Sequence, residues 1–421
     1  MKKITVLALG MLLSLAACGS SFAQDRTTVS ALSNGLGVIS SGFSGETAAA
    51  CLFIKTGSAH EPAGKSGITA LLCSSVLSSN PVDNADPPSL RIEQAGGKVT
   101  ADVEADYTCL TIVSPAASFP AALKALAAIV SGGYFSDTAV QIEKGALLSR
   151  NDLARDRAEE KMYHALFPSG LPGDIEKLSR KDLLAWRTAR FRPDESLLSV
   201  CGPFSSQAAI GMAEDAFKDW KAGGKAYSQE RPPAFKPDEV VDLESAPGTA
   251  GVLFACKFPS PDNPEYCAAL TARAILSGGM SSKVYKSIRG EEPKAYQSGN
   301  ALLWKSASPV MTVYSVTDET NIDGAIEGIK GSVKAVEEGK FSPEELSRGK
   351  AFALGEAEFL AESAESTARY AGLYAISGAG WDYRESLPKQ FLNIGKDDVV
   401  KAAEKYFNGN ALVVMRPAKE Q

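Results

Sequence analysis

The sequence predicts an α+β protein of two similar domains, each a largely antiparallel sheet with helices packed on one face. The 421 residues exceed what one hydrophobic core usually serves. Strand-like runs rich in Val, Thr and Ile alternate with apolar runs of helical spacing. The order of these elements in the first half recurs in the second, although the halves share little sequence. A mixed order of strands and helix pairs favours layered α+β domains.

In the first half, Gly-containing turns separate short apolar runs, which is typical of strands at the core of a sheet. Ser179 is followed three residues later by Asp182, and this spacing predicts a capped helix start. Strands are expected over 36–41, 47–56, 98–103, 107–113 and 197–201, and helices over 66–77, 90–95, 119–130 and 137–158.

The second half begins with two expected strands, over 240–244 and 251–257, followed by a helix over 265–276. A further helix, a two-strand hairpin and two long helices come next. The last long helix is expected to begin at Ser342-Pro343-Glu344-Glu345, a capping box with proline at the first helical position.

A segment rich in helix and strand breakers separates the halves. It contains Gly223-Gly224 and Arg231-Pro232-Pro233-Ala234-Phe235-Lys236-Pro237. We therefore predict a linker over 223–238, a first domain over 27–222 and a second domain over 239–421.

The first 23 residues have the pattern of a signal peptide, with basic Lys2 and Lys3 before an apolar run. Two cleavage sites fit. Leu15-Ala16-Ala17-Cys18 resembles a bacterial lipobox, which makes Cys18 the lipidated first residue; Ser21-Phe22-Ala23 suits ordinary signal peptidase. Both predict an exported bacterial protein of the periplasm, and the lipobox adds a lipid anchor in the outer membrane as its only membrane contact.

Charge and cysteine usage argue against a nucleic-acid-binding protein and against a zinc-ribbon or Cys-x-x-Cys redox motif. A net charge of −6 without a basic tract argues against nucleic-acid binding. After the leader, six cysteines remain, none in a Cys-x-x-Cys pair. Four of them lie in apolar strand-like runs and are expected to be buried thiols; a disulfide between neighbouring strands stays open. These four are Cys51, Cys109, Cys201 and Cys256.

Four segments, in order along the chain, resemble the pitrilysin/insulinase-type zinc peptidases, which include the mitochondrial processing peptidases. Each segment alone is a weak match, and their order makes the resemblance strong. It implies two processing-peptidase-like domains. The segments are Leu32-Ser33-Asn34-Gly35-Leu36, Gly57-Ser58-Ala59-His60-Glu61-Pro62, Phe191-Arg192-Pro193-Asp194 with Val200-Cys201-Gly202, and Ser277-Gly278-Gly279-Met280-Ser281-Ser282-Lys283-Val284-Tyr285.

The metal site of that family is missing from this chain. Zinc there needs His-x-x-Glu-His, two imidazoles one helical turn apart around a water-activating Glu, and a further Glu downstream. The corresponding positions read Ala70, Cys73, Ser74 and Arg150. We therefore expect no metal site and no cofactor in this chain, with zinc only in a partner subunit.

The histidine count supports the same expectation. His60 and His164 are the only histidines, so no two-histidine helix motif exists. His60 is expected to make a local hydrogen bond in its loop. A new metal site from His60, Cys73 and a carboxylate, and a Cys73 nucleophile with His60 as base, are the weaker alternatives.

One family feature is retained, since Arg289 and Tyr296 match the Leu-Arg-x6-Tyr segment of bacterial relatives. The resemblance implies that both groups contact a substrate carbonyl as it becomes an oxyanion. The structural alternative is an Arg at a helix end paired with Glu291 or Glu292, and a packed strand Tyr.

Two further segments are candidates for substrate binding. Thr100 and Ala101 lie in a run that resembles the family's edge strand for extended substrates, with Thr100 replacing Asn. Gly278 and Gly279 either let a substrate backbone approach or simply end a helix.

Together these features predict a non-catalytic peptidase homologue. It would pair with a zinc-bearing sister chain, or with itself, and contribute Arg289 and Tyr296 to a shared chamber that hydrolyses extended peptides. The alternative is a peptide-binding or assembly protein of the cell envelope without proteolysis. A self-sufficient metallopeptidase is disfavoured.

Overall fold

The computed structural model describes most of the chain after residue 26. The leader with Cys18 and most of the predicted linker lie outside the described residues. Described are 27–78, 87–132, 135–155, 158–166, 172–221, 235–236, 238–245, 248–289, 295, 297–303, 309–359 and 362–417.

The first half builds a six-stranded sheet in the order β1-β2-β6-β3-β5-β4. Its neighbours are antiparallel except for β2 and β6. The bounds are β1 Thr28–Ala31, β2 Gly37–Gly42, β3 Thr47–Ile54, β4 Lys98–Val103, β5 Thr108–Pro115 and β6 Ser196–Gly202.

Most helices of this half share one hydrophobic core with one face of the sheet. Alternate residues of β3, such as Leu52 and Ile54, point into that core, as the period of two in a strand requires. The helices are α1 Ile68–Ser78, α2 Pro88–Gln94, α3 Phe119–Ser131, α4 Asp137–Arg155, α5 Ala158–Leu166, α6 Pro172–Ile175, α7 Arg180–Arg190 and α8 Ser206–Phe217.

The second half builds a five-stranded sheet in the order β7-β11-β8-β10-β9, with β7 and β11 parallel. Its strands are β7 Val240–Ser245, β8 Ala250–Lys257, β9 Gln297–Leu303, β10 Val310–Thr317 and β11 Ala411–Pro417. Its helices are α9 Tyr266–Ser277, α10 Lys283–Arg289, α11 Ile322–Glu337, α12 Pro343–Phe359, α13 Ala364–Ile376, α14 Tyr383–Leu392 and α15 Lys396–Tyr406.

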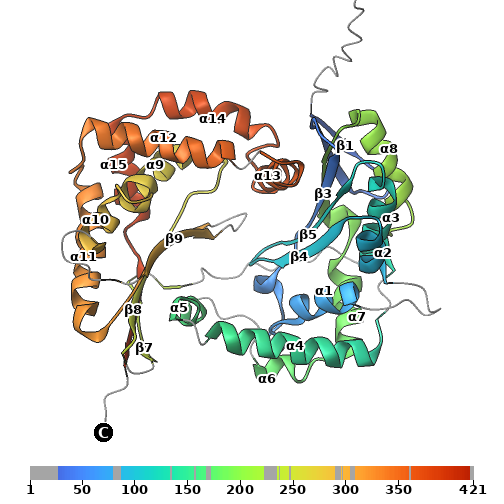
Figure 1. Cartoon of the computed structure of the whole chain (residues 1–421), viewed down its shortest axis with the longest axis horizontal. Helices are drawn as coiled ribbons and strands as arrows, with labels where there is room; N and C mark the ends of the chain where they lie inside the picture. Colours follow the sequence, from blue (N-terminus) through green and yellow to red (C-terminus); the bar gives the residue numbers. More distant parts are fainter. Residues whose placement is uncertain are drawn as a thin grey trace, which may run out of the picture.

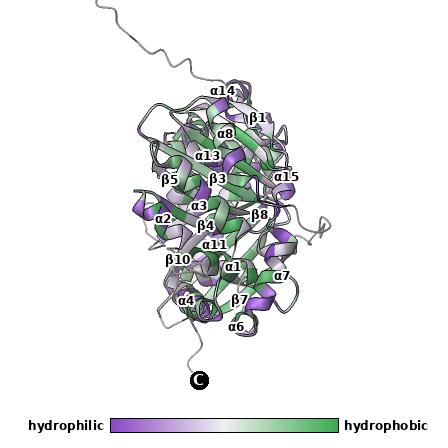
Figure 2. Cartoon of the chain, turned by 90° about the vertical axis from the view of Figure 1, so that its right-hand side faces the viewer, coloured by the Kyte–Doolittle hydropathy of each residue, from purple (hydrophilic) through white to green (hydrophobic). Residues whose placement is uncertain are grey.

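Each sheet has a second face, which is covered by one helix from the other half of the chain (Figure 1). Helix α13 of the second half packs on β3 and β6, whereas α5 of the first half packs on β8 and β11. The predicted α+β fold with two largely antiparallel sheets is confirmed, but the exchange of one helix between the halves was not predicted. Figure 2 agrees with such two-sided burial, because the hydrophobic strands lie inside and the hydrophilic patches lie on outer helices.

Two ion pairs fasten α13 to the edge strand of the first sheet. Arg369 Nη2 lies 2.7 Å from Asp102 Oδ2, and Lys98 Nζ lies 2.9 Å from Glu365 Oε2. The position of β4 therefore depends on a helix that is more than 250 residues away in sequence. No helix among the described residues is long and apolar enough to cross a membrane.

The elements expected from sequence are present with shifts of a few residues at their ends. The start of α7 follows the prediction closely: Ser179 Oγ accepts from the Asp182 amide, and Asp182 Oδ2 accepts from the Ser179 amide at 3.0 Å. Lys65 Nζ lies 2.7 Å from Asp182 Oδ1, and this contact first, then Ser179, lowers the pKa of Asp182 to about 2.

Asp182→Asn is expected to lower the free energy of unfolding at pH 7 by about 1 kcal/mol, after discount for the exposure of the pair. Because the folded pKa lies below the unfolded one, the stabilisation is present above about pH 4. It is lost as the pH falls toward 2. Urea unfolding of both proteins from pH 7 to pH 2.5 checks this, and a constant difference across that range would contradict it.

Candidate functional site

The loop before α1 is held by the buried carboxylate of Glu61. Its two oxygens accept from the amides of Gly67 at 2.7 Å and Thr69 at 2.9 Å, at the N-terminus of α1. A carboxylate is favourable there because the first helical amides lack partners within the helix. His60 Nδ1 accepts from the Gly57 amide at 3.1 Å, which confirms the local hydrogen bond expected for this histidine.

The side chains at the former zinc positions of α1 do not fit a metal. Ala70 has no donor atom, and the Ser74 hydroxyl donates to the Leu71 carbonyl at 3.2 Å. Cys73 is only 2% exposed and belongs to the hydrophobic core. Burial first, and the charge of Glu61 second, raise the pKa of its thiol to about 12. A buried thiol that stays protonated at neutral pH is neither a metal ligand nor a nucleophile.

The downstream ligand position is on α4, where Arg150 is exposed. Helix α4 packs against α1. The two helices that would carry the zinc ligands of the family are therefore adjacent, but the side chains at the ligand positions are not of types that bind zinc. Within the described residues, no three His, Cys, Asp or Glu side chains gather closely enough to hold a metal ion.

Thr100 and Ala101 lie on β4, which is the edge strand of the first sheet as predicted. Thr100 pairs with Thr111 of β5 and its side chain is exposed, whereas Ala101 is partly buried against the core. On its other side, β4 has no partner among the described strands. Such an edge offers main-chain groups to an extended peptide.

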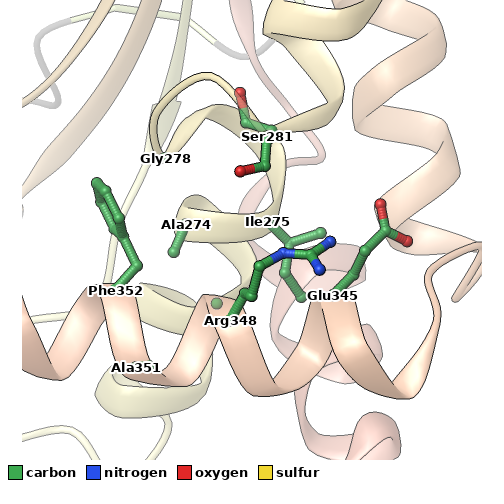
Figure 3. A pocket seen from close by; sticks show the side chains of 10 residues that line it. Ala274, Ile275, Gly278, Ser281, Glu345, Arg348, Ala351 and Phe352 are labelled. Atoms are coloured by element: carbon green, nitrogen blue, oxygen red, sulfur yellow. The ribbon is translucent and has the colours of Figure 1, made fainter.

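Gly278 and Gly279 follow the end of α9, beside a pocket of about 380 Å³. A Cβ on Gly278 would lie 2.5 Å from the Ala274 carbonyl oxygen, and Gly279 has φ +73°. Both positions therefore favour the helix-ending interpretation. Figure 3 shows Arg348 and Phe352 of α12 along this pocket.

Arg289 is the last residue of α10, and its side chain lies outside the described part of the chain, as does Tyr296. Their shared role remains a prediction. The six cysteines after the leader are buried, as expected for those in the strands, and all six are free thiols.

Sequence reasoning missed Arg273, which is 8% exposed on α9. Its Nη1 donates to Asn300 Oδ1 at 2.9 Å, and its Nη2 pairs with the carboxylate of Glu356. These partners are 27 and 83 residues away in sequence, so no local pattern indicates the network.

Comparison with known proteins agrees with this geometry. Two family models match, "Insulinase (Peptidase family M16)" over residues 38–169 and "Peptidase M16 inactive domain" over residues 177–352. An uncharacterized zinc protease of Rickettsia bellii is 23% identical over 92% of this chain and 97% of its own length. The probable mitochondrial-processing peptidase subunit beta of Schizosaccharomyces pombe is 24% identical over 60% of this chain, and the match spans only 59% of that subunit.

Solved structures show the same fold. A protease from Helicobacter pylori has a TM-score of 0.84 at 19% identity, over 93% of this chain and 100% of that one. A peptidase M16 inactive domain from Pseudomonas fluorescens also has a TM-score of 0.84, at 16% identity over 94% and 99%. With both family models in order along the sequence, the chain belongs to the insulinase family of peptidases, family M16.

Proposed function

We propose that this insulinase-family homologue is a non-catalytic subunit that pairs with a zinc-bearing sister chain. The proposal rests on the side chains of α1. The helix itself is retained, and Glu61 fixes its start, but Ala70, Cys73 and Ser74 cannot bind zinc. In the proposed complex the sister supplies the metal, and this chain supplies Arg289 and Tyr296 to the oxyanion.

The proposed substrate is an extended peptide that adds to the free side of β4. Main-chain hydrogen bonds supply most of the affinity in this mode, so the exposed Thr100 does not restrict the sequence of the peptide. The ion pair between Arg369 and Asp102 holds this edge against α13 and supports a fixed docking strand. A homodimer of this chain would contain no zinc site, which makes the heterodimer the better proposal.

The pattern of the leader supports a function in the cell envelope. We propose export to the periplasm, with either lipidation of Cys18 and anchoring in the outer membrane or cleavage after Ala23. Mass spectrometry of the N-terminal peptide from the native host separates the two.

A second function is favoured by one relative. Subunit 1 of the rat cytochrome b-c1 complex is 23% identical over 60% of this chain, and its name is that of a component of a larger complex. On that analogy, this chain would serve assembly or peptide binding in the envelope without any proteolysis.

Co-purification from the native envelope tests the proposal. We expect a sister chain with intact His-x-x-Glu-His, zinc in the complex, and peptidase activity that neither chain has alone. Arg289→Ala or Tyr296→Phe should lower that activity by about 10²-fold or more, whereas Arg416→Ala should leave it unchanged. Arg416 is the matched control because it is an exposed arginine of the same half, paired with Asp323 at 2.7 Å. Activity unaffected by both site substitutions, or a complex without activity, would favour the assembly role.

A further inference from the structure

Three buried cysteines lie on the face of the first sheet that α13 covers. They are Cys51 on β3, Cys109 on β5 and Cys201 on β6, and they share a hydrophobic cluster with residues of α13. All three are fully buried. A buried cysteine usually acts as a small apolar residue, so redox chemistry requires a specific contact between two thiols.

Two of these thiols face each other. Cys51 pairs with Thr111 and Cys109 pairs with Phe53, so the cysteines are diagonal neighbours on adjacent antiparallel strands. The Sγ atom of Cys51 lies 3.6 Å, and that of Cys109 3.5 Å, from the same hydroxyl oxygen, Oγ1 of Thr111. The two thiols also hydrogen-bond to each other. Their side chains therefore point toward one another, as the two halves of a disulfide must.

Other thiols have oxygen partners instead. Cys201 hydrogen-bonds to the side chain of Thr367 on α13. In the second half, the Cys267 thiol donates to Gln390 Oε1 at 3.3 Å. The structure therefore distinguishes Cys51 and Cys109 as a pair of adjacent thiols.

The surroundings favour ionisation of one thiol of this pair. The hydrogen bond from Cys51 is the first cause that lowers the pKa of Cys109; burial opposes it, and Thr111 and the charge of Arg369 add to it. The same hydrogen bond, followed by burial, raises the pKa of Cys51. Cys51 and Thr111 belong to the paired strands themselves, so they act as soon as β3 and β5 pair. Because the thiolate is the attacking form in disulfide exchange, Cys109 is the thiol that reacts first.

We infer that Cys51 and Cys109 form a disulfide between β3 and β5 when the chain folds under oxidising conditions. The oxidant is another disulfide, such as oxidised glutathione or that of a thiol–disulfide oxidoreductase. The Cys109 thiolate attacks one sulfur of the oxidant and displaces the other as a thiolate. The Cys51 thiolate then attacks the Cys109 sulfur of the mixed disulfide and displaces the second thiolate. Two protein thiols become one disulfide, and their two electrons and two protons convert the oxidant into two thiols.

The bond would close a loop of the chain that carries the candidate site. Helices α1 and α2 and the edge strand β4 all lie between Cys51 and Cys109 in sequence. A link between the two ends of this segment restricts the unfolded chain and holds the β4–β5 hairpin on β3. The inference does not depend on a sister subunit or on peptide binding. The proposed export would supply the oxidising compartment.

Refolding in a glutathione buffer tests the inference. Because both thiols are buried beneath α13, the purified full chain is first reduced and unfolded in urea. It is then refolded either with reduced and oxidised glutathione or with reductant alone. We expect two fewer reactive thiols after refolding with oxidised glutathione, and a linked pair of Cys51 and Cys109 peptides in a non-reducing digest. A refolded chain in which both cysteines are free, or in which either is linked to another cysteine, would overturn the inference.

Cys109→Ala is the diagnostic variant and Cys201→Ala is its matched control. Both remove a fully buried thiol from the same face of the sheet, and only the first belongs to the pair. C201A should lose two reactive thiols on oxidative refolding, as the unmodified chain does, whereas C109A should lose none.

The urea midpoint gives a second measurement. After oxidative refolding, reductant should lower the midpoint of the unmodified chain and of C201A by about 0.5–1 M and leave that of C109A unchanged. An equal shift in C109A would refute the inference. The digest of the unmodified chain decides the question even where a variant does not refold.

Discussion

Gly372→Ala is expected to destabilise the protein by about 1–3 kcal/mol, although alanine is the better helix former. Gly372 lies in α13, and a Cβ there would lie 2.1 Å from Cε2 of Phe53. Phe53 is fully buried in β3 and cannot move away without opening the first sheet. The added methyl therefore forces α13 away from the sheet and loosens the contact between the two halves.

Gly355→Ala is the control, because this glycine is also helical and has no atom within 4 Å of the added Cβ. It should stabilise the protein by about 0.5–1 kcal/mol through helix propensity. Urea unfolding measures both changes, and limited proteolysis at low urea shows whether the α12–α13 connection opens first in G372A. Equal effects of the two substitutions would contradict the packing argument.

The exchange of helices explains what the sequence could and could not predict about the fold. The run over 47–56 was identified as a strand because it is apolar almost throughout, and such runs occur where a strand is buried on both faces. Nothing local indicates which helix covers the second face. That partner, α13, is distant in sequence, and its small residues Ala364 and Ala368 give only a weak helical pattern.

The candidate site was predictable to a different degree at each position. Ala70, Cys73 and Ser74 could be aligned on a helix because the loop before them has recognisable residues, and the structure places them in α1. Which of them points inward depends on packing: Cys73 faces the core, whereas Ala70 and Ser74 are partly exposed. Arg273 could not be found in this way, because its partners come from β9 and α12.

Gly278 and Gly279 show that a motif can match a family and still be read in two ways. The sequence left substrate approach and helix ending equally open. The close Ala274 carbonyl and the positive φ of Gly279 favour the second interpretation. Backbone conformation decided the question, and a glycine in a sequence does not reveal it.

The triple substitution Ala70→His, Ser74→His and Arg150→Glu is expected to make this chain a stoichiometric zinc binder. Ala70 and Ser74 are four residues apart on the partly exposed face of α1, so two imidazoles there can reach one ion. Helix α4, which packs on α1, would supply the carboxylate in place of a repelling cation. Isothermal titration with zinc and metal analysis of tag-free protein measure the change.

The double substitution Ala70→His and Ser74→His serves as the control and should bind zinc more weakly than the triple, since Arg150 is retained. Stoichiometric zinc in the unmodified chain, lost on substitution of His60 or Cys73, would contradict the prediction and the proposed function together. A triple variant that folds but binds no better than the double would show that α4 cannot present its ligand to α1.

Zinc in the triple variant is expected without peptidase activity, because the Glu that activates water in the family corresponds to Cys73. That side chain lies in the core among Leu71, Leu72 and Val76 rather than toward the metal face. A carboxyl group placed there by Cys73→Glu would be desolvated, with its pKa raised, and would serve poorly as a base. We therefore expect that metal binding and catalysis can be restored to this chain only by separate changes. Metal binding requires changes only at the partly exposed Ala70 and Ser74 and the exposed Arg150, whereas catalysis also requires repacking the core beneath α1.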